Sequence, residues 1–132
     1  MNRKLAFLII ILFIASCGPE IQEEIEETYE DGTPKIVKLY EVDGDERKLI
    51  KEIGYYSNNQ IRIEGEFKDG KRHGKWYYWY ENGKMWSEGS FKNGRRDGPG
   101  ITYHENGEKY VVGTYDNDQR IGVWRFYDEN GN

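Results

Sequence analysis

KDGKRHGKWYYWYENGK, residues 68–84, places five consecutive aromatic side chains between two turn signals. The signals are Asp69-Gly70 and Asn82-Gly83. Two-residue hairpin loops favour such dipeptides because a type I′ turn needs positive φ at both central residues. The eleven residues that separate the two signals have the length of one β-strand. The stretch therefore predicts a strand bounded by two hairpin turns.

The same turn signals recur along the chain. From Asn58 onward their spacings alternate between 11 and 13 residues, which makes a repeat of 24 residues. A repeat of this length is typical of an array whose units bury surface only against their neighbours. The pattern predicts an all-β chain that forms an antiparallel meander of stacked β-hairpins. The signals are Asp43-Gly44, Asn58-Asn59, Asp69-Gly70, Asn82-Gly83, Asn93-Gly94, Asn106-Gly107, Asn117-Asp118 and Asn130-Gly131.

Counting outward from the turns predicts which residues pair across the strands. In every repeat an aromatic residue faces an arginine and a glycine faces a glycine, on one face of the sheet. Across Asn82-Gly83, Trp76 is expected opposite Gly89, where a ring can cover bare backbone, and Trp79 opposite Trp86. The other predicted pairs are Phe67–Arg72, Gly65–Gly74, Ile63–Trp76, Phe91–Arg96, Gly89–Gly98, Tyr115–Arg120 and Gly113–Gly122.

Alternate residues of a strand point to opposite faces, so the five aromatics divide between the two sides of the sheet. Trp and Tyr are favoured at protein interfaces, and exposed apolar patches mark interaction sites. We therefore expect a partner-binding patch on the face opposite the glycines. The alternative is that these rings cover one another and only stiffen the sheet. The candidate partner-binding residues are Tyr77, Trp79, Trp86, Tyr103 and Tyr110.

The N-terminus has the pattern expected of a targeting signal. Arg3 and Lys4 precede an apolar run of eleven residues, 5–15, which is shorter than the roughly 20 residues of a membrane span. The run ends in Ile14-Ala15-Ser16-Cys17, which closely resembles a bacterial lipobox, whose cysteine is lipidated and becomes the new N-terminus. Residues 1–16 are thus expected to be a lipoprotein signal peptide. An ordinary signal peptide or an N-terminal membrane anchor is the alternative.

Cys17 is the only cysteine, so no disulfide can form within the chain, and lipidation would give this residue its role. Residues 17–28 follow with five glutamates and no aromatic side chain, which predicts an extended acidic tether. A short helix is the alternative, because Ile21 and Ile25 are four residues apart. Loss of residues 1–16 would take the net charge from −5 to −7, which disfavours nucleic acid and anionic lipid as partners.

Residues 29–132 are expected to form the repeat domain. Its repeat, read as GEFKDGKRHGKWYYWYENG (65–83) and GSFKNGRRDGPGITYHENG (89–107), resembles the MORN repeat, and more closely the MORN variant of bacterial YwqK-type antitoxin-like proteins. The resemblance implies an elongated, twisted, single-layer sheet. The chain departs from the pattern at Gly100, which replaces a tryptophan, at Asp118 and at Ile121. The first unit, residues 29–55, is divergent, and its three extra residues predict a bulge or longer loop near residues 45–55.

Nothing in the sequence indicates catalysis. His73 and His104 lie next to turns, no nucleophile has a nearby base, and no spacing matches a zinc site. We therefore expect no enzyme activity, no cofactor and no metal. The expected function is a lipid-anchored module of the bacterial cell envelope, on the outer-membrane, periplasmic or surface side, that binds a protein partner.

The resemblance implies an immunity or antitoxin-like role for such a module. A cytoplasmic antitoxin role conflicts with the signal peptide. A cell-wall or other glycan, stacked on flat aromatic rings, is the first alternative partner. Phospholipid is the second alternative, and the acidic charge disfavours it. An enzyme is the least favoured alternative.

Overall fold

The computed structural model describes residues 9–10 and 18–132. Cys17 and nearly all of the expected signal peptide lie outside these residues, so lipidation stays a prediction. Within the described residues, no helix has the length and apolarity needed to cross a membrane.

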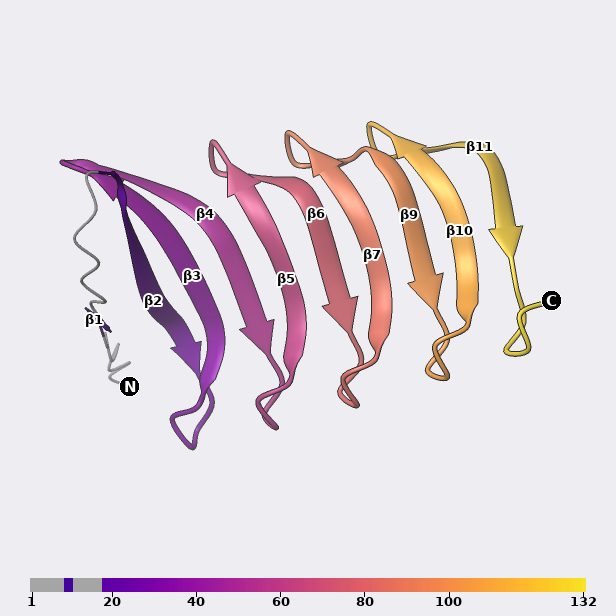
Figure 1. Cartoon of the computed structure of the whole chain (residues 1–132), viewed down its shortest axis with the longest axis horizontal. Helices are drawn as coiled ribbons and strands as arrows, with labels where there is room; N and C mark the ends of the chain where they lie inside the picture. Colours follow the sequence, from indigo (N-terminus) through magenta and orange to yellow (C-terminus); the bar gives the residue numbers. More distant parts are fainter. Residues whose placement is uncertain (1–8, 11–17) are drawn as a thin grey trace, which may run out of the picture.

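The described residues form one open antiparallel sheet of eleven strands, as the all-β prediction required. Strands follow one another in chain order, and the short β8 pairs with β7 beside the main path. Figure 1 shows a single curved layer with hairpin turns along both rims. The strands are β1 (Ile9–Ile10), β2 (Glu20–Thr28), β3 (Pro34–Asp43), β4 (Glu46–Tyr55), β5 (Ile61–Lys68), β6 (Lys71–Trp79), β7 (Met85–Lys92), β8 (Arg95–Arg96), β9 (Gly98–Tyr103), β10 (Lys109–Asp116) and β11 (Gln119–Phe126).

Side chains at one rim tie each hairpin to the next. Tyr56 donates its hydroxyl hydrogen to the carbonyl of Trp79 at 2.8 Å, and Tyr80 does the same to Tyr103 at 2.8 Å. His104, 24 residues after Tyr80, bonds through Nε2 to the carbonyl of Tyr127 at 2.9 Å. These bonds recur with the period of the sequence, so each repeat is held by the next one along the array.

The acidic segment differs from the prediction. Residues 20–28, expected as part of a free tether, form β2 and pair with β3 along their length. The reason is complementary charge, because Glu27 pairs with Lys35 at 3.0 Å and Glu24 pairs with Arg47. Ile25 also faces Val37, one of the few buried side chains. Basic side chains of β3 and β4 thus relieve the self-repulsion of the glutamate run.

The bulge predicted for the first unit, residues 29–55, is confirmed. Leu39 pairs with Lys51 and Tyr40 pairs with Leu49, so the intervening Ile50 is an extra residue in β4. One extra residue on one strand is a β-bulge, which bends the strand and increases its twist.

The predicted glycine–glycine pairs are wrong. Phe67 faces Arg72 as expected, but Gly65 then faces Trp76, because Gly74 and Lys75 bulge out of the β5–β6 ladder. Ile63 consequently faces Tyr78 instead of Trp76. Gly74 has φ 67°, a left-handed conformation that glycine adopts without a Cβ penalty.

Equivalent two-residue bulges occur 24 and 48 residues later. Gly98 (φ 102°) and Gly122 (φ 64°) hold the same place, so neither pairs with the glycine predicted to face it. The adjacent predictions, Phe91–Arg96 and Tyr115–Arg120, are confirmed. The second glycine of each repeat is therefore a bulge residue. The bulge shifts the cross-strand pairing of the residues that follow it by two positions.

A second bulge changes the pairing around Trp86. Trp76 faces Gly89 as predicted, but its ring covers Gly65 and leaves Gly89 uncovered. Trp79 faces Met85 instead of Trp86, because Trp86 is an extra residue between Met85 and Ser87. Tyr110 is extra in the same way against β9. The Trp86 ring packs against Tyr78, with ring centroids 5.9 Å apart. Trp86 therefore lies on the face that carries the glycines.

Candidate functional site: a pocket above a row of glycines

One row of cross-strand partners runs from strand to strand across the sheet. Gly65 faces Trp76, Trp76 faces Gly89, and Gly100 faces Gly113. We call the side of the sheet to which the Trp76 side chain points the glycine face. Along this row tryptophan is expected at every 24th position from Trp76, but the middle repeat has Gly100 there.

Counting from the regular repeat of residues 65–83 as the first, the repeat of residues 89–107 is the middle one and the next is the third. In the first repeat the tryptophan ring covers the neighbouring glycine. A Cβ built on Gly65 would lie 2.1 Å from Cδ2 of Trp76, so the ring rests directly on the backbone. Trp76 is fully buried, and its Nε1 donates to the carbonyl of Glu66 at 3.1 Å. Phe67 packs edge-on against it at 5.4 Å, and the guanidinium of Arg72 lies 4.0 Å above the ring. Glycine below, an aromatic ring beside and arginine above define what we call a tryptophan subsite.

The third repeat builds the same subsite. A Cβ on Gly113 would lie 2.2 Å from Cδ2 of Trp124. Tyr115 packs edge-on against this ring at 5.0 Å, and the guanidinium of Arg120 lies 4.4 Å from its centroid. The same arrangement occurs twice, 48 residues apart, so the repeat itself specifies a tryptophan subsite.

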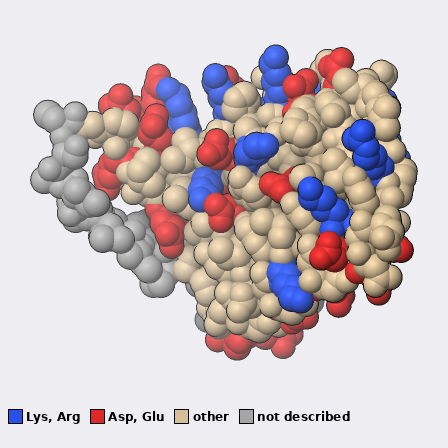
Figure 2. Space-filling view, turned by 45° about the vertical axis from the view of Figure 1, so that its right-hand side comes forward, with Lys and Arg blue, Asp and Glu red and all other residues tan. Residues whose placement is uncertain are grey.

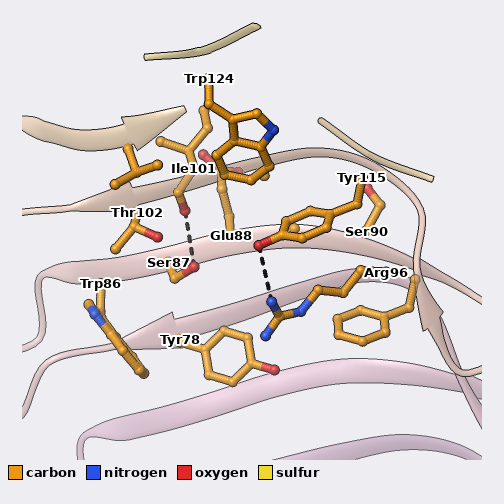
Figure 3. Close-up of a pocket in the computed structure, with 14 residues that line it drawn as sticks. Tyr78, Trp86, Ser87, Glu88, Ser90, Arg96, Ile101, Thr102, Tyr115 and Trp124 are labelled. Atoms are coloured by element: carbon orange, nitrogen blue, oxygen red, sulfur yellow. Dashed lines mark hydrogen bonds between the residues drawn. The ribbon is translucent and has the colours of Figure 1, made fainter. Parts of the chain in front are cut away.

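The middle repeat has the subsite without the ring. A Cβ on Gly89 would meet no atom within 4 Å, although the equivalent glycines are covered. A pocket of about 250 Å³ opens at this place, lined by Gly89 and Gly100 and by aromatic rings on either side. Figure 3 shows Tyr115 and Trp124 on one side of the pocket and Tyr78 and Trp86 on the other.

The polar residues that line the pocket are Ser87, Glu88, Ser90, Arg96 and Thr102. Arg96 donates from Nη1 to the hydroxyl of Tyr115 at 3.1 Å, and its guanidinium lies 5.1 Å from that ring (Figure 3). The ion pairs found among residues 18–132 do not include Arg96. Ser87 donates its hydroxyl hydrogen to the carbonyl of Ile101 at 3.0 Å. The pocket thus combines aromatic walls with one cation that has no carboxylate partner.

The five predicted partner-binding residues do not share a face. Trp86 lines the pocket and Tyr110 occupies the equivalent bulge one repeat later, both 45 % exposed. Tyr77 and Trp79 contact each other on the opposite face, with ring centroids 5.9 Å apart. The prediction of a single patch is therefore wrong in its geometry, because the bulges at Trp86 and Tyr110 reverse the alternation there.

Tyr103 remains on the opposite face with Tyr77. Its hydroxyl donates to Oε1 of Glu88 at 2.6 Å, and Glu88 faces Tyr77 across the ladder. Burial, together with this bond to a carboxylate, raises the pKa of Tyr103 to about 12. The tyrosine is thus held in its neutral form and serves as a cross-strand link between β9 and β7.

Sequence reasoning missed the residues that make the pocket. Arg96, Phe91 and Tyr115 were predicted only as members of cross-strand pairs, and Trp124 was not singled out. The available signal was Gly100, which interrupts an otherwise regular tryptophan position. Among the described residues, no group of three or more histidine, cysteine, aspartate or glutamate side chains is placed to hold a metal ion. The arrangement can bind a flat apolar group beside a cation.

The family comparisons agree with the observed hairpin array. The profile of the MORN repeat variant matches residues 49–69, 72–93 and 120–132, and that of the MORN repeat matches residues 88–109. No curated protein and no solved structure shows a significant match to the chain. The matched segments coincide with the strands and turns of the 24-residue units described above. The chain is therefore a MORN-repeat protein.

Proposed function

We propose that this protein is a lipid-anchored interaction module of the bacterial cell envelope, and that it binds a protein partner with its glycine face. The observation that carries the proposal is the open aromatic pocket between two filled tryptophan subsites. Tryptophan, tyrosine and arginine are the residues that most often dominate interface energetics, and Trp86, Tyr115 and Arg96 all line this pocket.

The rest of the surface also suits a protein partner. In Figure 2 the acidic and basic side chains are interspersed over the visible face. A nucleic-acid partner would call for a basic stripe, and the chain has a net charge of −5. The binding energy would therefore come from the aromatic pocket, with the mixed charges around it setting orientation.

The proposed anchor is lipidated Cys17. β2 begins at Glu20, only three residues after this cysteine, so the anchored sheet would start close to the membrane surface. Metabolic labelling with a radioactive fatty acid tests the anchor. The label and the membrane association are expected in the wild-type chain and absent in Cys17→Ser. Equal membrane association of the two chains would contradict lipid anchoring through Cys17.

The proposed role of the partner complex is immunity or antitoxin-like, with the toxin met in the envelope. This narrower role is supported by the resemblance to YwqK-type proteins and by the lipobox-like sequence at residues 14–17, and it is tested by the identity of the captured partner. A glycan remains the alternative occupant, because sugars also stack on exposed aromatic rings.

Capture of proteins from envelope lysate tests the proposal when variants of the two faces of the sheet are compared. Trp86→Ala alters the glycine face, and Trp79→Ala is its matched control on the opposite face. The wild-type chain and Trp79→Ala are expected to retain a stoichiometric protein that Trp86→Ala loses. Loss only in Trp79→Ala would contradict the assignment of the face. Sedimentation with purified cell wall, without a captured protein, would contradict a protein partner and favour the glycan.

A further inference from the structure

We propose that the pocket of the middle repeat binds a tryptophan side chain of the partner protein. This proposal rests on the proposed function and adds the chemistry of the contact. Trp76 and Trp124 fill the subsites on either side, and Gly100 stands midway between them in the sequence. The fold therefore forms three tryptophan subsites and fills two of them with its own rings. The third subsite, in the middle repeat, is left for a ring from the partner.

The size of the pocket fits one side chain. Its volume of about 250 Å³ is larger than the roughly 150 Å³ cavity that accommodates benzene, so a two-ring indole has room. It is smaller than the roughly 300–1,000 Å³ of sites for whole drug-sized ligands. A single aromatic side chain that protrudes from a protein surface matches this intermediate size.

The charge at the pocket is complementary to an aromatic face. Arg72 and Arg120 lie over the tryptophan rings of their own repeats, at 4.0 and 4.4 Å. Arg96 is their equivalent in the middle repeat, and no ring of its own subsite lies beneath it. A guanidinium is attracted to the electron-rich face of an aromatic ring, most strongly to tryptophan. Arg96 thus presents a cation where the repeat places an indole.

The polar groups favour an indole over a sugar. A buried sugar needs several hydrogen-bond partners, because hydroxyl groups left unpaired in a dry site are costly. The Ser87 hydroxyl already donates to the carbonyl of Ile101, and the Tyr115 hydroxyl already accepts from Arg96. Ser90 and Thr102 also line the pocket, but most of its other walls are aromatic rings, aliphatic side chains and glycine backbone, which offer contact area and little hydrogen bonding.

Gly100→Trp is the variant that separates this pocket from the rest of the surface. A Cβ on Gly100 would lie 3.5 Å from Cε2 of Tyr115, an ordinary contact, so the first atom of a side chain is accepted there without a clash. The new ring is expected to occupy the empty subsite and close it. Val123→Trp is the matched control, because it adds the same ring at a position that is 72 % exposed and outside the pocket lining.

The test uses the full chain in detergent micelles and N-acetyl-L-tryptophanamide as the probe. In ¹H–¹⁵N spectra the backbone amides of Gly89 and Gly100, which line the pocket, are expected to shift saturably, with a Kd of roughly 1 mM for so small a ligand. N-acetyl-L-leucinamide should bind more weakly. Val123→Trp should keep the response, and Gly100→Trp, folded as judged by its dispersed spectrum, should lose it.

Arg96→Met tests the contribution of the cation. It is expected to weaken binding of the probe roughly 2- to 30-fold, the range that a cation over an aromatic ring supplies. Arg72→Met makes the same change above Trp76, outside the pocket lining, and should leave the affinity for the probe unchanged. Equal weakening by both substitutions would contradict a specific role of Arg96 in the pocket.

The outcomes distinguish this inference from the proposed function. No saturable shift in the wild-type chain, an undiminished shift in Gly100→Trp, or tighter binding of N-acetylglucosamine at the same glycines would overturn the tryptophan site. If an envelope protein is captured through Trp86 and Gly100→Trp still captures it, the interaction module stands and this inference fails. If the probe binds as expected but no envelope protein is captured, the pocket stands and the proposed function fails.

Discussion

Gly65, Gly89 and Gly113 hold equivalent positions in three repeats, but the space above them differs. Trp76 and Trp124 rest on the first and the third, and nothing lies within 4 Å of a Cβ on Gly89. At the scale of single residues, the presence or absence of a tryptophan ring therefore decides whether each glycine can be replaced by a residue with a side chain.

Alanine substitution at these glycines should have opposite effects on stability. Gly65→Ala forces the buried Trp76 ring to move, so we expect it to lower the free energy of unfolding by about 1–3 kcal/mol. Gly89→Ala meets no atom, so we expect it to raise the free energy of unfolding by about 0.4–1 kcal/mol, because it restricts the unfolded chain. Urea unfolding of both variants measures the difference, and equal effects would contradict the assigned ring positions.

At the scale of the element, the strands are bent by two bulges per repeat. The turn dipeptides, and the pairs next to them such as Phe67–Arg72, could be predicted because a two-residue turn fixes its flanking residues. The bulges of the 24-residue repeats could not, because counting from a turn assumes an uninterrupted ladder. Gly74 illustrates the difficulty, since a glycine within a strand fits either a pair or a bulge until the neighbouring strand is known.

The link between β7 and β9 should make stability depend on pH in alkaline solution. The folded chain holds the phenolic proton of Tyr103 up to a pKa of about 12, because of burial and its bond to Glu88, whereas the unfolded chain releases it near the ordinary value of about 10. The folded state therefore binds more protons between these values, and the free energy of unfolding falls as pH rises from about 10 to about 12.

Denaturant unfolding of the wild-type chain and Tyr103→Phe across this range measures the contribution. The phenylalanine variant is expected to lose stability less steeply, and Glu88→Gln, which removes the nearby charge, should have an intermediate slope. An identical slope in wild type and Tyr103→Phe would show that this tyrosine does not titrate as described.

At the scale of the whole molecule, each strand of the main path pairs only with its neighbours in a single layer. β6 is paired on both sides and holds the fully buried Trp76, whereas β11 pairs only with β10 and exposes Val123 and Phe126. Local stability should therefore decline toward the C-terminal edge. Amide hydrogen exchange is expected to be at least roughly tenfold faster in β11 than in β6. Uniform protection across the sheet would instead indicate one cooperative unit.

The sequence predicted the array more fully than the site. Regular turn spacing made the meander visible, and Gly100 was visible as an interruption of the tryptophan pattern. That interruption becomes a pocket only because the bulges bring the other tryptophans over Gly65 and Gly113. The acidic segment was predicted as a tether because its composition lacks core residues, and its pairing depends on Lys35 and Arg47, which belong to other strands.

The central claim is that the middle repeat contains a tryptophan subsite without its tryptophan. The measurement that tests it most directly is the stability of Gly100→Trp against the wild-type chain in urea. If the added indole settles between Gly89 and Arg96, the free energy of unfolding should rise by about 1–2 kcal/mol, less than the full burial of a large aromatic side chain because ordering the ring opposes it. A loss of stability would contradict the claim, because it would show that the fold has no place for an indole there.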